Sequence, residues 1–171
     1  MTARLASLLA ASALAAAAVP ARAQLRLDGV RWEAGRVAAG RVADWQAVQV
    51  VENPPPKLRQ RLRVRLLVRN DGSKPVEGVL VRYSLTARVS SAGGPGVWAI
   101  PFSVDEKHVP IVGASKAVEV FLDGGPALDL YARRLAREGW WLDRLKVQAM
   151  VEPRAGETTL LTSEQVLEFA R

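Results

Sequence analysis

The chain has 171 residues, a formal net charge of +7 and no cysteine. The lack of cysteine excludes a disulfide framework, a thiolate metal site and a cysteine nucleophile. Hydrophobic residues make up 49% of the chain, which is enough to form the core of one ordinary domain.

The first 23 residues have the pattern of a secretory signal. Met1–Arg4 carry positive charge, Leu5–Val19 form an apolar run, and Ala21-Arg22-Ala23 offers the small-x-small pattern of a cleavage site. The apolar run is about 15 residues long, shorter than the roughly 20 that a membrane-spanning helix needs. We therefore expect residues 1–23 to be cleaved, leaving a mature chain that starts near Gln24 and has no transmembrane segment.

Composition also predicts a location. A bacterial lipoprotein carries its lipid on a cysteine at the cleavage site, so this chain is not expected to be a lipoprotein. The alanine- and arginine-rich composition is typical of a GC-rich bacterial genome. We expect a periplasmic or extracellular bacterial protein, and we do not expect nucleic acid as a partner there.

Residues 24–56 are predicted to form N-terminal strands and a stiff link. Leu25–Glu33 alternates loosely and predicts a first strand, and Trp45–Glu52 predicts a second. Between them, two Gly-Arg-Val-Ala copies start five residues apart at Gly35 and Gly40, a period that fits neither helix nor strand. We interpret them as a turn-rich connection. The run Asn53-Pro54-Pro55-Pro56 then predicts an extended linker, because consecutive prolines do not fit a helix or a central strand.

Lys57–Arg69 has the clearest pattern of the chain. Apolar and basic residues alternate with a period of two, which predicts a strand with one buried and one solvated face. The turn signal Asn70-Asp71-Gly72 follows it. Further strands are predicted at 76–89, at 97–104 (an edge strand, because of Pro101), at 116–123, at 142–152 and at 158–169, with a helix at 126–138.

These elements predict an all-β protein, an antiparallel immunoglobulin-like β-sandwich of seven to eight strands with one crossover helix at about 126–138. We expect residues 24–171 to form one domain, with its sandwich core in 57–171. The sequence leaves open whether loops 90–96 and 105–113 are ordered, and it also leaves the oligomeric state open.

The predicted sandwich resembles a bacterial extracytoplasmic module of the immunoglobulin and fibronectin type. The motifs that carry the resemblance are Val64-Arg-Leu-Leu-Val-Arg-Asn70-Asp-Gly, Lys74-Pro-Val-Glu-Gly-Val-Leu-Val81, Ile111-Val-Gly113 and Val118-Glu-Val-Phe-Leu122. They are similar to the FxLYD type, in which a strand ending in Asn meets a second strand after a Lys-Pro turn. Arg82-Tyr83-Ser84-Leu85 stands where Leu-Tyr-Asp would follow. The resemblance implies a fold and no catalytic residues.

A basic face is the first candidate site. Residues 53–101 hold nine basic residues against Asp71 and Glu77, whereas the segments before and after are neutral or slightly acidic. If the next strand pairs through the Asn70-Asp71-Gly72 turn, its arginines join those of the first strand on one face. We define the basic face as Lys57, Arg59, Arg61, Arg63, Arg65, Arg82 and Arg88.

Two interpretations of the basic face stay open. It could bind an anionic envelope polymer or lipid headgroup, such as lipopolysaccharide or a wall polymer, because arginine pairs with phosphate and carboxylate in two-point fashion. It could instead be a solvated strand face that discourages aggregation and is neutralised by Glu119, Glu152 or Glu168. The first interpretation requires the arginines on one face with no acids opposite.

The five tryptophans and the single histidine offer weaker candidates. Core packing is expected for the tryptophans in general, with one of the adjacent Trp140 and Trp141 buried and the other covering the helix. Trp98, Trp140 and Trp141 could stack on sugars if two rings lie coplanar and exposed. His108 follows Asp105-Glu106-Lys107 and is expected on a surface loop, because closed metal sites need three or four ligands at fixed spacing.

The sequence contains no nucleophile motif, second histidine or phosphate loop, so we expect no catalytic residues, no metal and no cofactor. The leading hypothesis is a non-catalytic envelope interaction module that docks a partner protein through a strand edge or loop face. Polyanion or envelope-lipid binding through the basic face is second, and a carbohydrate-binding module is third. Partner docking requires an unpaired edge or an apolar surface patch of several hundred Å².

Overall fold

The computed structural model describes residues 25–38, 41–52, 60–91, 94–152 and 160–170. The predicted signal at 1–23 and the whole proline-rich link at 53–56 lie outside these residues. The described part contains nine strands and one helix: β1 (Leu25–Ala38), β2 (Arg41–Ala47), β3 (Val50–Glu52), β4 (Gln60–Asn70), β5 (Val76–Ser91), β6 (Val97–Val112), β7 (Ala117–Asp123), α1 (Gly125–Arg137), β8 (Trp140–Val151) and β9 (Leu161–Ala170). No helix among these residues is long and apolar enough to cross a membrane.

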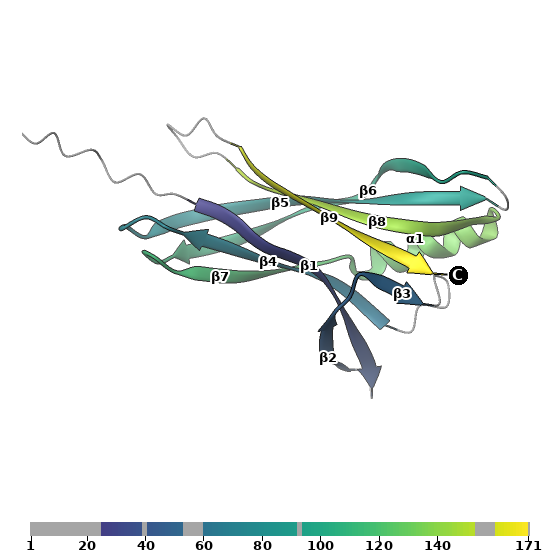
Figure 1. Cartoon of the computed structure of the whole chain (residues 1–171), viewed down its shortest axis with the longest axis horizontal. Coiled ribbons are helices and arrows are strands. Elements are labelled where there is room, and N and C mark those ends of the chain that lie inside the picture. The colour runs from purple at the N-terminus through teal and green to yellow at the C-terminus, as the bar shows by residue number, and fades with distance from the viewer. Residues whose placement is uncertain (1–24, 39–40, 53–59, 92–93, 153–159, 171) are drawn as a thin grey trace, which may run out of the picture.

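The strands form two sheets that pack face to face (Figure 1). Sheet A has the order β2-β1-β4-β7, and sheet B has the order β3-β9-β8-β5-β6. Neighbouring strands are antiparallel except β3, which pairs parallel to β9. The predicted all-β sandwich with one helix is therefore confirmed, with more strands than the seven to eight expected.

The core lies between the two sheets. On β4 the buried apolar residues are Leu62, Val64, Leu66 and Val68, so the period of two predicted for 57–69 is confirmed for the described part of that strand. Trp32 of β1 is buried, and its Nε1 donates to the carbonyl of Gln165 on β9 at 3.3 Å, which joins the two sheets. The apolar residues of both sheets form one continuous cluster.

Helix α1 crosses from sheet A to sheet B, as predicted. It begins at Gly125 with Pro126 in its first turn and ends one residue before the predicted 138. Leu128, Ala132 and Leu135 are buried against the sandwich. A stacked contact between Tyr131 and Phe102 of β6, with ring centroids 4.7 Å apart, fixes the helix beside sheet B.

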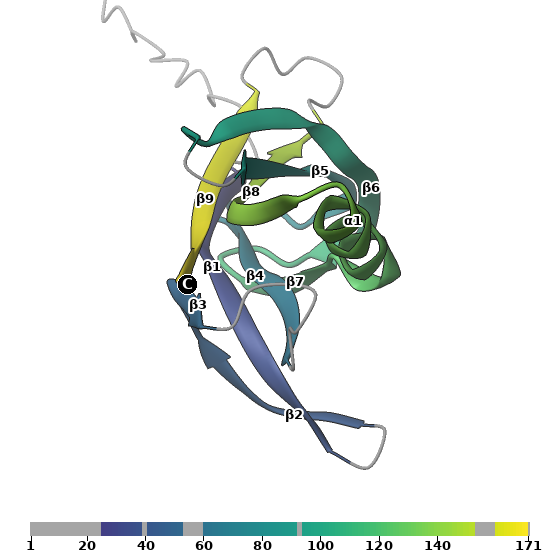
Figure 2. The same cartoon turned by 90° about the vertical axis from the view of Figure 1, so that its right-hand side faces the viewer.

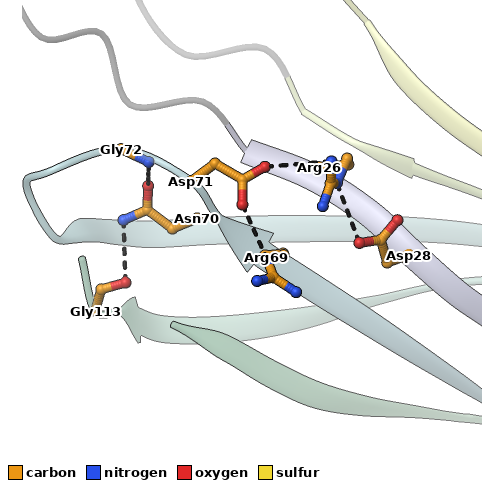
Figure 3. Close-up of polar contacts among 7 residues, drawn as sticks. All are labelled: Arg26, Asp28, Arg69, Asn70, Asp71, Gly72 and Gly113. Atoms are coloured by element: carbon orange, nitrogen blue, oxygen red, sulfur yellow. Dashed lines mark hydrogen bonds and ion pairs between the residues drawn. The ribbon is translucent and has the colours of Figure 1, made fainter. Parts of the chain in front are cut away.

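The Asn70-Asp71-Gly72 turn does not form the expected hairpin. It carries the chain from β4 in sheet A to β5 in sheet B, so the two strands are not neighbours. Asn70 is fully buried, and its amide donates to the carbonyls of Lys74, Val112 and Gly113. Its Oδ1 accepts from the N–H of Gly72, and Figure 3 shows this bond and the one to Gly113. This side chain ties the turn to the end of β6 on the opposite sheet.

Three local predictions were wrong. The segment predicted as a turn-rich connection forms a β-hairpin, because β1 runs on to Ala38 and β2 starts at Arg41. The predicted strand 45–52 is split between β2 in sheet A and β3 in sheet B. The predicted loop around His108 belongs to β6, which continues to Val112.

Candidate functional site

The structure divides the predicted basic face between the two sheets. Arg61, Arg63 and Arg65 lie on β4 in sheet A, whereas Arg82 and Arg88 lie on β5 in sheet B. The expectation of one shared face was wrong, because the turn after β4 changes sheets. Lys57 and Arg59 lie outside the described residues.

Each described arginine of the basic face has an acidic partner. Arg61 Nη1 lies 2.9 Å from Asp129 Oδ2, Arg65 pairs with Glu119, and Arg88 Nε lies 3.4 Å from Asp143 Oδ2. Hydrogen bonding to Arg65 lowers the pKa of the Glu119 carboxyl.

Sheet B repeats this arrangement around Arg82. Its guanidinium lies 3.6 Å from Glu106 on β6 and 3.5 Å from Glu152, which directly follows β8. Two of the three acids expected to neutralise the basic face, Glu119 and Glu152, therefore do so, while Glu168 pairs with Arg144 at 2.8 Å.

Arg63 is the centre of a cluster on the outer face of sheet A. Its guanidinium carbon lies 3.9 Å from the ring centroid of Trp45 on β2 and 4.0 Å from that of Phe121 on β7. Its Nη2 lies 2.8 Å from Glu33, a carboxylate only 4% exposed that also pairs with Arg31 at 3.1 Å. The Arg63 guanidinium is thus held between two aromatic rings, and the buried Glu33 carboxylate neutralises its charge.

Gly35 makes this cluster possible. A Cβ at Gly35 would lie 2.5 Å from Val42 Cγ1 and 2.8 Å from the Trp45 ring. Both side chains therefore lie across the glycine, on the same outer face as Arg63.

Ion pairs continue along the rest of this face. At the end nearest Asn70, Arg26 pairs with Asp28 at 3.1 Å and with Asp71 at 3.5 Å, and Arg69 also pairs with Asp71 (Figure 3). Across the described residues of the face and its margins, six arginines are paired with five carboxylates: Arg26, Arg31, Arg61, Arg63, Arg65 and Arg69 with Asp28, Glu33, Asp71, Glu119 and Asp129. The face is therefore nearly neutral and carries interleaved charges.

The hairpin of β1 and β2 extends beyond the sandwich as an arm (Figure 2). We define the arm as residues 35–38 and 41–44. The two Arg-Val-Ala copies lie opposite each other, with Val37 directly opposite Val42 and Arg36 opposite Ala43. From Arg36 to Ala38 and from Arg41 to Asp44 every residue is exposed, so the described part of the chain leaves both faces of the arm in solvent.

Strand β6 is a second prominent surface. It lies at the margin of sheet B and has one neighbouring strand, β5, among the described residues, which confirms the predicted edge position. Of the twelve exposed large apolar residues of the described chain, five lie on β6: Val97, Trp98, Ile100, Val104 and Ile111.

An open groove of about 500 Å³ lies beside this edge, on the outer face of sheet B. Its lining includes Val104 of β6, Arg82 of β5, Met150 and Gln148 of β8, and Glu164 of β9. The cross-strand register brings these side chains to one face, because Ser84 lies opposite both Val104 and Gln148. The lining combines apolar side chains with one cation and one carboxylate.

The predicted sugar-binding tryptophans lie near one end of sheet B, since Trp98 is opposite Arg88 of β5 and Trp141 and Trp140 are opposite Ser90 and Ser91. Trp98 of β6 is partly exposed and faces the ammonium of Lys146 at 4.9 Å, and Trp140 and Trp141 start β8. His108 is exposed on β6, and its Nε2 lies 3.5 Å from Glu106. The described residues contain no group of three or more His, Cys, Asp or Glu side chains that could hold a metal.

Tyr83 marks a contact that sequence reasoning missed. Its buried hydroxyl lies 3.2 Å from Asp105 Oδ2 on β6 and 3.4 Å from the carbonyl of Asp123 at the end of β7. Burial, followed by the charge of Asp105, raises the pKa of Tyr83 to about 12. The period of two placed Tyr83 on an inward face, but nothing in the sequence indicated which acids it would meet.

No protein-family model and no curated protein matches the chain. Among solved structures, the chain is similar to one described as the crystal structure of a protein from Archaeoglobus fulgidus. The identity is 13%, the match covers 85% of this chain and 98% of that chain, and the TM-score is 0.34. A likeness at this level supports no conclusion about fold or function, and the FxLYD resemblance stays a prediction.

Proposed function

We propose that the protein is a non-catalytic binding module that docks a partner protein along β6. The observation that carries the proposal is the concentration of exposed apolar side chains on this edge strand, where Val97 is 59%, Ile100 is 83% and Val104 is 73% exposed. A long strand edge is a template for pairing with another chain. The exposed apolar side chains of β6 lie at 97–104 and at 111, and charged residues occupy 105–108.

The proposed mode is strand addition, in which an extended segment of the partner hydrogen-bonds to the free edge. Pro101 and Pro110 lack an N–H, so the partner strand is expected to pair with the stretch between them. Val104 lies in this stretch and also lines the groove on sheet B. Backbone hydrogen bonds would supply affinity, and the groove would select the partner's side chains.

The two other hypotheses have less support. A polyanion would have to displace carboxylates from Arg61, Arg65, Arg82 and Arg88. Sugar stacking would need a platform of parallel rings. Among the described residues, the stacked pair is Phe102 with Tyr131, where α1 meets β6.

The partner is expected in the bacterial envelope, since residues 1–23 have the pattern of an export signal. The test is photo-crosslinking in that compartment. A photoreactive amino acid is placed at Val104, and a matched probe is placed at Leu130, an exposed apolar residue of α1. We expect one discrete cross-linked protein from position 104 and none from position 130.

A Val104→Pro variant provides the second arm, because it removes a backbone donor from the edge while β5 and the core stay unchanged. With the probe moved to Ile100, this variant should lose the cross-linked product and keep its circular dichroism spectrum. The same product from positions 104 and 130, or no product from either, would contradict the proposal.

A further inference from the structure

The outer face of sheet A carries an apolar stripe that the proposed function does not use. Val37 and Val42 face each other on the arm, Trp45 follows, and Phe121 lies beyond Arg63. Val37, Val42 and Phe121 are all exposed, and Trp45 is half-buried. Since β2 and β7 are the two edge strands of sheet A, the stripe runs from the arm across the sheet to β7. Figure 2 shows how the arm projects from the sandwich.

The composition of the stripe is that of an interface centre. Trp and Arg are enriched among the residues that contribute most to protein–protein binding, and they act when surrounded by a polar rim that excludes water. Here Arg63 is already desolvated by two rings and neutralised by Glu33, so covering it costs little further desolvation. The pairs Arg61–Asp129 and Arg65–Glu119 lie around it as a polar rim.

The arm also lacks cover. An isolated two-stranded hairpin is at best marginally stable in water, and the described residues place no second layer over the arm. Its Val37–Val42 pair faces the same side as the sheet's stripe, so one flat partner surface could cover both.

The charge of the face selects the partner. Six paired arginines and five paired carboxylates alternate over it, so a strongly acidic or basic partner would meet repulsion as often as attraction. A second copy of the same face, related by a twofold axis, brings the same alternation and the same apolar stripe. We propose that the outer face of sheet A is a homodimer interface, in which each arm reaches over the sheet of the second copy.

This interface is separate from β6, which lies in the other sheet, so the dimer and the partner docking are tested independently. The first measurement is sedimentation velocity of the exported chain over a wide range of concentrations. We expect a reversible monomer–dimer equilibrium. Val42→Glu should weaken it by about 30-fold or more, the size of a hot-spot loss. Leu160→Glu introduces the same charge at an exposed apolar residue beside sheet B, and it should leave the dimer intact.

The lack of cysteine allows a second readout that does not depend on the charge change. A single Cys at position 42 should be alkylated more slowly as the protein concentration rises through the dimerisation range, and a single Cys at position 160 should keep its rate. A monomer at all concentrations overturns the proposal. A dimer that survives Val42→Glu and leaves the thiol at position 42 fully reactive also overturns it, because that dimer uses another surface.

Discussion

The hydroxyl of Tyr83 lies 3.2 Å from Oδ2 of Asp105, its direct cross-strand neighbour on β6. The same hydroxyl lies 3.4 Å from the carbonyl of Asp123, where β7 of sheet A ends. One buried side chain therefore connects the edge strand proposed for docking to the opposite sheet. This contact links β6 to the end of β7, in addition to the ladder that pairs β6 with β5.

Tyr83 is expected to make the folded protein less stable as the pH rises above 10. Its pKa is raised from an ordinary value of 10 to about 12 by burial and by the charge of Asp105. Because the folded pKa exceeds the unfolded one, the contribution of the protonated hydroxyl is complete below pH 10. It is lost as the pH rises through 12. We expect the free energy of unfolding, measured by urea denaturation, to fall between pH 10 and 12 in the natural protein.

Tyr83→Phe is the matched variant for this effect. It should lose about 1 kcal/mol at pH 8 through the missing hydrogen bond and should show a smaller decline above pH 10. Equal pH dependence in the two proteins would contradict the assignment.

Gly35 is expected to tolerate no side chain. In Gly35→Ala the new Cβ would lie 2.5 Å from Val42 and 2.8 Å from the Trp45 ring, so the ring must leave Arg63. We expect a loss of about 1–3 kcal/mol, as in other overpacked sites, and a red-shifted tryptophan emission. Gly113→Ala is the control, since its Cβ would meet only the flexible Lys116 side chain at 3.2 Å. A Gly35→Ala protein as stable as the control would show that the Trp45 ring is not closely packed against Gly35 and Arg63.

Glu33 is expected to contribute more stability than any exposed acid of sheet A. Its buried carboxylate neutralises Arg63 and Arg31, so Glu33→Gln leaves Arg63 without an ionic partner among the described residues. We expect a loss of about 2 kcal/mol in the free energy of unfolding. Glu119→Gln removes an exposed ion pair of the same face and should cost less than about 1 kcal/mol. Similar losses in the two variants would argue against a special role for Glu33.

Much of the fold was predictable because its signals are local. The alternation in β4 depends on which residues avoid water, and Pro126 and Gly139 bracket a helix by their backbone preferences. The edge position of β6 followed from Pro101, which cannot donate to a central ladder. None of these inferences required knowledge of distant parts of the chain.

The candidate surfaces were not predictable, because they depend on which sheet each strand joins. The turn after Asn70 reads as a hairpin in sequence, yet the buried Asn70 amide binds carbonyls at the end of β6 and sends the chain to the other sheet. Because the chain changes sheets at this turn, Arg63 lies on sheet A and Arg82 lies on sheet B. The Trp45–Arg63–Phe121 cluster joins three strands whose pairing follows only from the whole topology. The signal that could have indicated the arm was the pair of Gly-Arg-Val-Ala copies, whose spacing is compatible with a tight hairpin.

The arrangement of the basic face predicts weak binding to polyanions. Each of its described arginines already faces a carboxylate, so a sulfated polymer gains little by replacing one anion with another. We expect the exported chain to leave a heparin column below physiological salt. Changing Arg61 and Arg82 to Gln should move this elution only slightly to lower salt, because these two cations are already paired with carboxylates in the natural protein and add little to binding. Lys57→Gln with Arg59→Gln tests the two members of the basic face outside the described residues.

Retention above physiological salt that is lost in the Arg61 and Arg82 variant would contradict the prediction, since each ionic contact adds to the salt dependence of binding. It would also favour polyanion binding over partner docking as the role of these arginines.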